Sequence, residues 1–321
     1  MEKLLDVKNL SVEFGMRKGA VRAVRDVNFT LGKGERLGLV GESGAGKSVT
    51  GFSIINLISK PGYIVKGSQV MFEGRNLSEL DYNEIRQIRG NRISMIFQDP
   101  MMTLNPVLTI GTQMIETLQA HSNISKEDAV KIALEKLRKV YIPSPEKRLD
   151  QYPHEFSGGM RQRIVIAISL LTEPNLIIAD EPTTALDVTI QAEIMELLLE
   201  LCANDNMGLI LITHDLAVVS EVTQKIAVMY AGRIVEMGDT TEVVTNPHHP
   251  YTQGLIKALP QSDTAGTRLY QIPGVMPSLV NMPEGCAFHP RCEKCQDICK
   301  KEIPELLQKE SGIMAACHLV K

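Results

Sequence analysis

Residues 41–48 read GESGAGKS, between the apolar run 35–40 (ERLGLV) and a helical pattern of apolar residues over 49–58 (VTGFSIINLI). The stretch fits G-x-x-x-x-G-K-[ST], in which glycines allow backbone N–H groups to turn inward around a phosphate. A strand before it and a helix after it give the context that such a loop needs, and the helix dipole adds attraction for an anion. Residues 41–48 therefore predict a phosphate loop at the end of a core strand.

Further apolar runs predict the class of the fold. Residues 176–180 (LIIAD) and 208–213 (GLILIT) are short, apolar and followed by polar residues. Such runs, separated by helical segments, are typical of a parallel sheet buried on both faces. Leu4–Phe14 and Val27–Leu31 alternate more, which favours an antiparallel edge sheet. We expect an α/β fold with a phosphate-loop (P-loop NTPase) core and an antiparallel β subdomain.

The pattern changes between Pro100 and about Gln151. Residues 109–120 (TIGTQMIETLQA) and 126–140 (KEDAVKIALEKLRKV) have helical period and composition. Ser125 precedes the second segment and has an acidic residue three positions later, at the spacing of a capping box. A helical subdomain is therefore expected within the α/β core, over about residues 99–166.

A change of composition near 245–260 marks a second boundary. Beyond it come a short helical pattern (252–259, TQGLIKAL) and then a stretch rich in Pro and Cys. We therefore expect a nucleotide-binding domain over residues 1–250 and a small Cys-rich C-terminal extension over 251–321.

Composition narrows the function. The chain has 321 residues, of which 44 % are hydrophobic and 4 % aromatic, with no Trp and a formal net charge of −4. Few aromatic residues and no long basic block disfavour nucleic acid as the main partner. Residues 1–8 (MEKLLDVK) do not resemble a signal peptide, and the longest apolar run, 164–171, is too short to span a bilayer. We expect any link to a membrane to come through a partner.

Polar residues at strand ends supply what the phosphate loop lacks. Asp180 ends an apolar run and is suited to hold a magnesium water, and Glu181 beside it is suited to polarise an attacking water as general base. Lys47 would neutralise β- and γ-phosphate oxygens, and the Ser48 hydroxyl would bind Mg²⁺. Acidic residues at the end of a strand often only cap the following helix. The prediction of a catalytic site therefore depends on their combination with the phosphate loop.

Two further polar residues occupy similar positions. His214 follows the run 208–213, at the end of a core strand, where ligands bind in such sheets. Gln98 ends the strand-like stretch 92–98 (RISMIFQ), where it would sense magnesium and move the helical subdomain. Taken singly, His214 is more simply interpreted as a structural histidine and Gln98 as an ordinary loop amide.

A second glycine stretch, residues 157–163 (SGGMRQR), opens an apolar helix. Small residues, free N–H groups and a helix dipole make such a helix start an anion site. An ordinary helix start capped by Ser157 is the simpler reading in isolation. Two anion sites with one pair of acids suggest two halves of one ATP site that different molecules present to each other.

Six motifs in this order and spacing resemble the ATP-binding cassette ATPases over about residues 4–245: the phosphate loop, Gln98, the second glycine stretch, 176–182 (LIIADEP), 184–187 (TALD) and His214. The resemblance implies a head-to-tail dimer in which Ser157 and Gly159 contact the γ-phosphate held by the partner's Lys47. Asp187 would couple the two sites, and Phe14 would stack on adenine. The resemblance also implies that the P-loop NTPase core is RecA-like. Met160 and Phe156 depart from the commonest motif, which has Gln and Leu there, and we still expect a competent site.

The expected functional residues follow from the motifs and the resemblance together. The nucleotide contacts are Phe14, Gly41, Ser43, Gly44, Ala45, Gly46, Lys47, Ser48, Val49, Ser157, Gly158, Gly159 and Asp187. The catalytic residues are Glu181, His214, Lys47 and Gln98, and the Mg²⁺ site consists of Ser48, Gln98 and Asp180.

Five of the six cysteines crowd the end of the chain, where residues 286–299 read CAFHPRCEKCQDIC. Four thiolates could hold zinc or an iron–sulfur cluster, and C-x₂-C at Cys292 and Cys295 leans towards zinc. Residues 246–260 (NPHHPYTQGLIKALP), IPG and GCAFHPRC, however, resemble the C-terminal extension of the peptide-importer branch. That resemblance implies a [4Fe–4S] cluster on Cys286, Cys292, Cys299 and Cys317, with zinc and free thiols as alternatives. Cys202 is expected to be a small buried side chain.

The resemblance implies the ATPase subunit of a bacterial importer of di- or oligopeptides, peripheral at the cytoplasmic face of the membrane. Two permease subunits would dock near residues 98–106. A second, related ATPase would complete a heterodimer, and an extracellular substrate-binding protein would deliver cargo. A nickel or glutathione importer of the same branch remains open. A soluble cassette ATPase acting on DNA or ribosomes and an iron–sulfur redox protein are weaker alternatives, because neither a coiled-coil insertion nor a partner cofactor motif is present.

Overall fold

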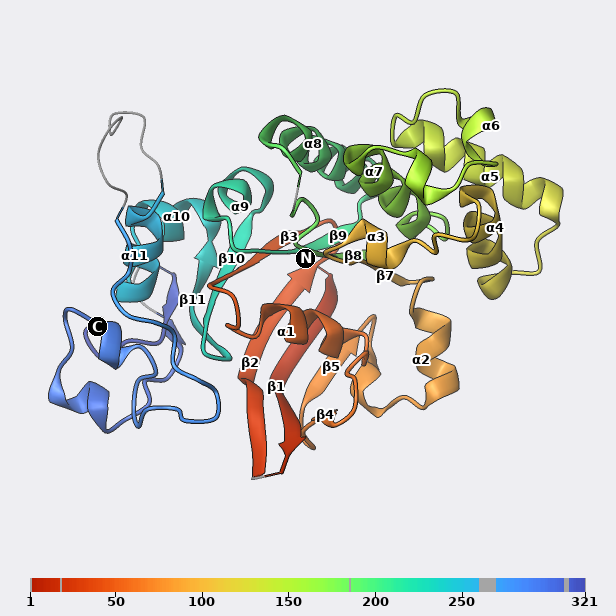
Figure 1. The fold of residues 1–321 in the computed structure, drawn as a ribbon. Helices are drawn as coiled ribbons and strands as arrows, with labels where there is room; N and C mark the ends of the chain where they lie inside the picture. Colours follow the sequence, from red (N-terminus) through yellow and green to blue (C-terminus); the bar gives the residue numbers. More distant parts are fainter. Residues whose placement is uncertain (1, 18, 185, 260–269, 309–311, 321) are drawn as a thin grey trace. The chain divides into compact units, whose positions relative to one another are not determined.

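The computed structural model describes residues 2–17, 19–184, 186–259, 270–308 and 312–320. The chain forms two compact units, which are described separately (Figure 1). The first consists of Met1–Glu79 together with Leu211–Lys321, and the second of Leu80–Ile210.

The first unit begins with an antiparallel sheet in the order β2-β1-β5-β6, in which β4 also pairs with β1. Its strands are β1 (Lys3–Met16), β2 (Gly19–Gly32), β4 (Gly62–Ile64), β5 (Gln69–Phe72) and β6 (Arg75–Asn76). Leu10 lies opposite Val27, and both are fully buried. The antiparallel sheet predicted from the alternating pattern is therefore confirmed.

A second sheet in this unit carries the phosphate loop. In the order β12-β13-β11-β10-β3, the strand β3 is parallel to β10, and the other pairs are antiparallel. The strands are β3 (Arg36–Val40), β10 (Lys225–Tyr230), β11 (Arg233–Asp239), β12 (Leu307–Gln308) and β13 (Met314–Ala315). Next to β3 lies β9 (Gly208–Thr213), which belongs to this unit from Leu211 onward. The runs predicted at 35–40 and 208–213 are strands.

Short helices complete the first unit. They are α1 (Lys47–Ile54), α9 (Leu216–Val222), α10 (Thr240–Thr245), α11 (Pro250–Lys257) and the 3₁₀ turns η1 (Leu77–Glu79), η3 (His289–Arg291) and η4 (Asp297–Lys300). The C-terminal residues join the second sheet, because Ala315 of β13 pairs with Glu236 of β11.

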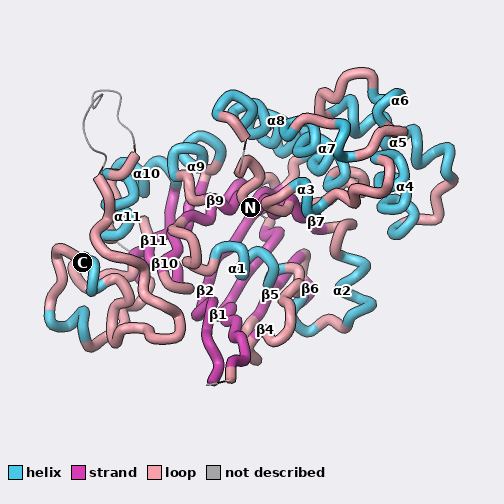
Figure 2. The backbone as a smooth tube through the Cα atoms, in the orientation of Figure 1, coloured by secondary structure: helices cyan, strands magenta, loops and turns pink. Residues whose placement is uncertain are grey.

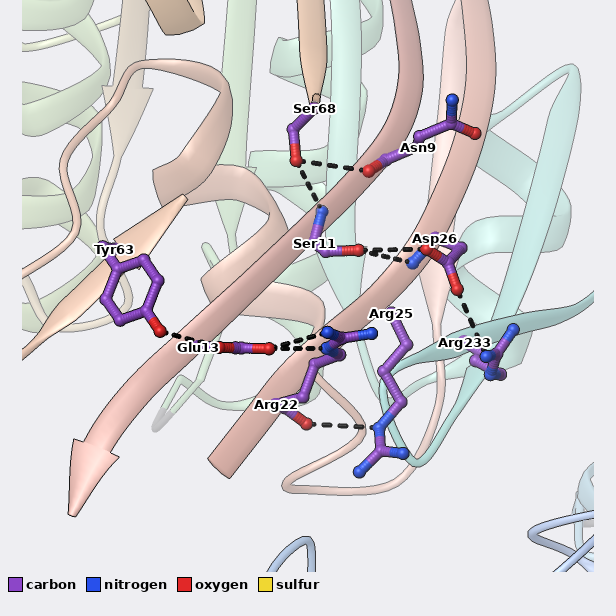
Figure 3. A network of polar contacts seen from close by, with 9 residues as sticks. All are labelled: Asn9, Ser11, Glu13, Arg22, Arg25, Asp26, Tyr63, Ser68 and Arg233. Atoms are coloured by element: carbon purple, nitrogen blue, oxygen red, sulfur yellow. Dashed lines mark hydrogen bonds and ion pairs between the residues drawn. The ribbon is translucent and has the colours of Figure 1, made fainter. Parts of the chain in front are cut away.

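Polar contacts cross between strands of the first unit (Figure 3). The Glu13 carboxylate of β1 accepts hydrogen bonds from Arg22 Nε (2.9 Å) and Tyr63 Oη (2.7 Å). Arg233 of β11 lies 3.2 Å from the Asp26 carboxylate of β2. These pairs connect β1 with its neighbours and join the antiparallel sheet to the second sheet.

The second unit is mostly helical (Figure 2). A parallel pair, β7 (Ile93–Ile96) and β8 (Leu176–Asp180), contributes its strands. The helices are α2 (Tyr82–Ile88), α3 (Pro100–Thr103), α4 (Ile110–His121), α5 (Lys126–Lys139), α6 (Pro145–Arg148), α7 (Gly158–Ser169), α8 (Val188–Asp205) and the turn η2 (Pro153–Glu155). The predicted helices at 109–120 and 126–140 are present, and the Ser125 hydroxyl accepts from Asp128 N as the α5 cap.

The compact units divide the chain in another way than the predicted domains, whose limits stay predictions. The helical subdomain expected over 99–166 lies inside the second unit, whereas the expected extension 251–321 belongs to the first. The strands β10 and β11 were not predicted, although β10 is buried beyond its first residue and β11 is buried over Ile234–Glu236. Across the described residues, no helix is both long and apolar enough to cross a bilayer.

Candidate functional site

Glycine conformation shapes the phosphate loop between β3 and α1. Gly44 (φ 81°) and Gly46 (φ 102°) occupy the left-handed region, which strains other residues. A Cβ on Gly46 would lie 2.8 Å from the Ala23 carbonyl oxygen, and one on Gly41 would lie 2.3 Å from that of Met229. Backbone conformation or close packing therefore requires glycine at these positions, and the loop follows the path that the motif predicts.

Lys47 begins α1 and is buried, at 5 % exposed. Its Nζ donates to the carbonyl oxygens of Gly41 (2.8 Å) and Glu42 (3.1 Å). The Glu42 carbonyl also accepts from Ala45 N at 3.1 Å, which closes the turn. The ammonium group is thus held by the loop's own carbonyls. Ser43 is exposed, and Ser48 and Val49 are half-buried.

Phe14, the predicted adenine contact, lies on β1 opposite Gly62 of β4. A Cβ on Gly62 would lie 2.6 Å from Phe14 Cε1, so the ring packs against a backbone that has no side chain there. The ring remains half-buried. One supported face and one partly open face suit an aromatic stacking contact.

Gln98 and Glu181 lie together in the second unit. Gln98 Nε2 donates to Glu181 Oε2 (3.1 Å), and Thr184 Oγ1 donates to the same oxygen (2.9 Å). Glu181 follows the fully buried strand β8 and has a φ of 46°, which is uncommon for a residue other than glycine. Asp180, the last residue of β8, is 4 % exposed. The predicted base is therefore oriented by two neighbours.

His214 belongs to the first unit and directly follows β9. Its side chain is exposed, while the next residue, Asp215, caps α9 through Ala217 N (2.9 Å). The histidine thus stands where a strand ends and a helix begins, as the sequence predicts. Its role in hydrolysis stays a prediction.

The second glycine stretch is a capped helix start. Ser157 is exposed, and its hydroxyl accepts from Met160 N at 3.4 Å at the beginning of α7. A Cβ on Gly159 would lie 2.7 Å from Ile190 Cγ2, so this glycine lets α7 approach α8. Asp187 caps α8 by accepting from Ile190 N at 3.0 Å. The structure therefore brings Gly159 and Asp187 to neighbouring helix starts.

The unusual motif residue Phe156 has a packing role. It is 4 % exposed, and the Arg148 guanidinium lies 5.8 Å from the centre of its ring. On α7, Gln162 is 1 % exposed, and its Nε2 has no hydrogen-bond partner among the described residues. Met160 is half-buried. Phe156 is therefore a buried packing residue directly before the Ser157 cap.

The four predicted cluster ligands are neighbours. Cys286 N donates to the Cys299 carbonyl at 2.8 Å. Burial raises the pKa of the Cys286 thiol to about 11, and the nearby thiols of Cys299, Cys317 and Cys292 add to the shift. Within the described ranges, however, no three His, Cys, Asp or Glu side chains form a group that could hold a metal. The predicted iron–sulfur or zinc site is therefore not assembled, because proximity is present without a ligand geometry.

The remaining cysteines behave differently. Cys295, outside the predicted cluster set, donates its thiol to the Gln296 carbonyl at 3.5 Å. Cys202 is 2 % exposed on α8, which confirms the expected small buried side chain.

Sequence reasoning missed the residues that surround Glu42. The Arg291 guanidinium contacts both oxygens of the Glu42 carboxylate, and the Tyr251 hydroxyl accepts from Glu42 N. Glu42 occupies a position that the phosphate-loop pattern leaves free, so the motif carries no signal for these contacts. The contacts of Glu42 with Arg291 and Tyr251 are visible only in the folded structure.

Comparisons with known proteins match two parts of the chain. Residues 24–184 match the family model for the ABC transporter, and residues 235–299 match the oligopeptide/dipeptide transporter C-terminal region. A dimeric ATP-binding cassette in a post-hydrolysis state, bound to ADP and Pi, is similar in structure. It has a TM-score of 0.66 and 28 % identity, covering 74 % of this chain and 98 % of that one.

Similar sequences run nearly the full length. The oligopeptide transport ATP-binding protein OppD of Escherichia coli is 48 % identical over 98 % of this chain and 93 % of its own. The dipeptide transport ATP-binding protein DppD of Escherichia coli is 47 % identical (98 % and 96 %), and a probable peptide ABC transporter ATP-binding protein of Sinorhizobium fredii is 50 % identical (98 % and 94 %). The predicted P-loop fold is confirmed, and the chain belongs to the ABC transporter family, in the branch that has the oligopeptide/dipeptide C-terminal region.

Proposed function

We propose that this chain is the ATP-hydrolysing subunit of a bacterial importer of di- and oligopeptides. The observation that carries this function is that one chain matches both the ABC transporter model, over residues 24–184, and the oligopeptide/dipeptide transporter C-terminal region, over residues 235–299. Cassette ATPases serve many kinds of transporter, so the C-terminal match is what narrows the cargo to peptides. Relatives named for peptide transport, similar over 98 % of the chain, support the same assignment.

Each motif residue takes a role in hydrolysis. Lys47 binds the β- and γ-phosphates, and Ser48, Gln98 and Asp180 hold Mg²⁺. Glu181 acts as general base, supported by the hydrogen bond from Gln98, which would place the amide between the metal and the base. Chemically, Mg²⁺ would supply charge neutralisation on the phosphate oxygens.

The remaining nucleotide contacts complete the site. His214 would hold the γ-phosphate, and Phe14 would stack on adenine. In the phosphate loop, backbone N–H groups bind the triphosphate, and the exposed Ser43 borders them.

The second half of the site comes from another chain. Ser157, Gly158 and Gly159 present the start of α7, and the exposed Ser157 supports contact with a partner's γ-phosphate. Asp187 lies at the neighbouring start of α8 and couples the two sites. A second, related ATPase is the expected partner in a heterodimer, and ATP binding closes the pair.

Coupling to the membrane runs through residues 98–106. Met101 is 45 % exposed and Met102 86 %, and Val107 just beyond is 75 % exposed. Such exposed apolar side chains support docking of two permease subunits. Because Gln98 contacts Glu181, movement of the docked segment would reach the catalytic base. The chain would work at the cytoplasmic face, with a substrate-binding protein outside.

The cysteines at the end of the chain would bind a [4Fe–4S] cluster through Cys286, Cys292, Cys299 and Cys317, with zinc as the alternative. Four neighbouring thiols support this donor set. Because no metal-binding group is assembled among the described residues, binding would require the thiols to reorient and lose protons. Visible absorption of the anaerobically purified chain, with iron and zinc analysis, tests this assignment.

Reconstitution with the neighbouring permeases in proteoliposomes tests the function. Uptake of labelled di- and oligopeptides that requires ATP and stops with Lys47→Ala is the expected result. Uptake of nickel or glutathione in place of peptides would move the chain to another cargo of the same branch. Co-purification with nucleic acid and no permease would contradict the transport function.

A further inference from the structure

Glu42 places a carboxylate inside the loop that is proposed to bind a triphosphate. An uncompensated negative charge there would repel the ligand, and the two N–H···O contacts from Arg291 neutralise it. Arg291 Nη1 donates to Glu42 Oε2 (2.9 Å), and Nη2 donates to Oε1 (3.1 Å). This two-pronged geometry is the strongest form of an arginine–carboxylate pair.

Residues of β10 and of the C-terminal segment (within residues 251–321) hold Arg291 from several sides. Its side chain is 5 % exposed, and its Nε donates to the Pro273 carbonyl at 2.8 Å. The guanidinium also lies 5.8 Å from the ring centre of Tyr230 and 5.9 Å from that of Phe288. A guanidinium with these partners has little freedom to rotate, so it presents a fixed fork to Glu42.

Two other C-terminal residues brace the same loop. The buried Tyr251 of α11 accepts from Glu42 N at 2.9 Å. A Cβ on Gly44 would lie 3.1 Å from Met276 Cε, so Met276 packs against the loop. The loop is therefore held from the C-terminal segment at the Glu42 backbone, the Glu42 side chain and Gly44.

These contacts reach Lys47 through one carbonyl. The Glu42 carbonyl accepts from Lys47 Nζ and from Ala45 N, both at 3.1 Å. Releasing Glu42 would therefore loosen the turn and the ammonium group together. A loop that spends less time in its binding conformation binds more weakly in proportion to the lost fraction.

We propose that Arg291 is a positioning residue for nucleotide binding: through Glu42 it fixes the phosphate loop and cancels a charge that would repel the triphosphate. The inference rests on the proposed phosphate-binding role of residues 41–48. It gives the C-terminal segment a part in ATP affinity, independent of any metal at the cysteines.

The test is titration of the full chain with Mg²⁺ and the non-hydrolysable analogue AMP-PNP. Arg291→Gln should raise Kd about tenfold, equivalent to about 1.4 kcal/mol, because both the loop geometry and the charge balance are lost. Adding Glu42→Gln to Arg291→Gln should recover part of the affinity, since the repelling carboxylate is then gone. Arg291→Lys, which keeps the charge but loses the fork, should lie between Arg291→Gln and wild type.

The matched control is Lys300→Gln, which removes an exposed ion pair with Asp297 in the same segment and should leave Kd unchanged. A Kd for Arg291→Gln within twofold of wild type would overturn the proposal. A double variant no tighter than Arg291→Gln would also do so, since a purely structural role predicts no recovery.

Two further measurements keep the proposal testable. Should Arg291→Gln not fold, Glu42→Gln should speed hydrogen exchange of the amides of residues 42–46, and unchanged exchange there would contradict the proposal. Lys47→Ala separates the two hypotheses. If Lys47→Ala binds AMP-PNP like wild type, the proposed phosphate-loop role of residues 41–48 is wrong. If Lys47→Ala weakens binding and Arg291→Gln does not, only the role of Arg291 is wrong.

Discussion

The phosphate loop and the second glycine stretch both place glycines at a helix start, yet their construction differs. In the phosphate loop, Gly44 and Gly46 adopt left-handed φ, and no side chain caps α1. In the second stretch, Gly158 and Gly159 have ordinary helical conformation, and the Ser157 hydroxyl caps α7. The phosphate loop needs glycine for its backbone conformation. The second stretch is an ordinary capped helix start, in which the missing side chain of Gly159 lets α8 approach.

The difference extends to how each stretch is supported. The phosphate loop is braced within its own unit by Arg291 and Tyr251, and Lys47 already lies inside it. Ser157 is exposed at the start of its helix. A braced loop with a buried lysine can bind a ligand within one chain, whereas an open helix start becomes a site only when a ligand is brought to it. The contrast is the structural argument for a divided ATP site.

The largest expected effect comes from removing the proposed catalytic base, which should stop hydrolysis and leave the phosphate loop able to bind nucleotide. Glu181→Gln should lower ATP hydrolysis about 10²- to 10⁴-fold, because an amide cannot accept the proton of the attacking water. Nucleotide affinity should persist, since the phosphate loop is intact. Steady-state hydrolysis in the assembled transporter measures the first, and AMP-PNP titration the second. Glu193→Gln, an exposed carboxylate paired with Arg163, is the control; equal activity of both variants would refute the base.

Ser157→Arg should break the second glycine stretch alone. Hydrolysis should fall about 10²- to 10³-fold through loss of contacts to a partner's γ-phosphate, while the variant's own AMP-PNP affinity stays within about twofold. Ser125→Arg is the matched control, because it also removes a serine cap, from α5. A parallel loss of the variant's own affinity would mean that Ser157 contacts nucleotide within one chain.

Alanine at the two helix starts compares the glycines directly. Gly46→Ala should lower the free energy of unfolding by about 1–3 kcal/mol, because of its φ of 102° and the 2.8 Å approach to the Ala23 carbonyl. Gly158→Ala should cost less than about 1 kcal/mol, because its φ is helical and its Cβ would lie 3.3 Å from the flexible end of Leu186. Urea unfolding of both variants measures the difference. Equal costs would remove the contrast in backbone requirement.

The smallest effect concerns pH and the brace around Tyr251. Burial lowers the pKa of His249 to about 3, and its neutral Nδ1 accepts from Tyr251 N. Since the unfolded histidine has a pKa near 6.5, the unfolded chain binds the proton first, so stability is present above that pH and is lost as pH falls. Between pH 7 and 5.5 the loss should be about 1 kcal/mol.

His249→Asn keeps a capping acceptor without titrating and should remove this dependence. Burial raises the pKa of Glu236, which accepts from His249 N and contributes with the opposite sign at lower pH. Comparing the two proteins by urea unfolding at each pH cancels that contribution. An unchanged slope in the variant would contradict the assignment to His249.

The sequence predicted what depends on local pattern. The phosphate loop, the buried strands and the helices after Thr109 and Ser125 follow from glycine spacing, apolar runs and caps, and all are present. The contact of Gln98 with Glu181 joins residues far apart in the chain and was not predicted, although both were expected at strand ends.

What escaped prediction depends on tertiary contact. The strand β10 is almost fully buried and β11 is buried over Ile234–Glu236, but their side chains lack the simple alternation that marks an edge strand. The partnership of Glu42 with Arg291 spans most of the chain. Glu42 occupies a variable position of the phosphate-loop pattern, and nothing in the stretch GCAFHPRC assigns a partner to Arg291. The cysteines show the converse: the resemblance to the peptide-importer branch implied a ligand set, yet close thiols in the described residues do not by themselves form a metal geometry.

The divided site is tested most directly by the rate of ATP hydrolysis per chain across a dilution series, with the mass of each species recorded during turnover. The account predicts that a chain verified as monomeric hydrolyses at least about 10²-fold more slowly than the same chain assembled with its partner ATPase and permeases, because the γ-phosphate then lacks Ser157 of another chain. A monomer that hydrolyses ATP at the full rate of the assembly would contradict it.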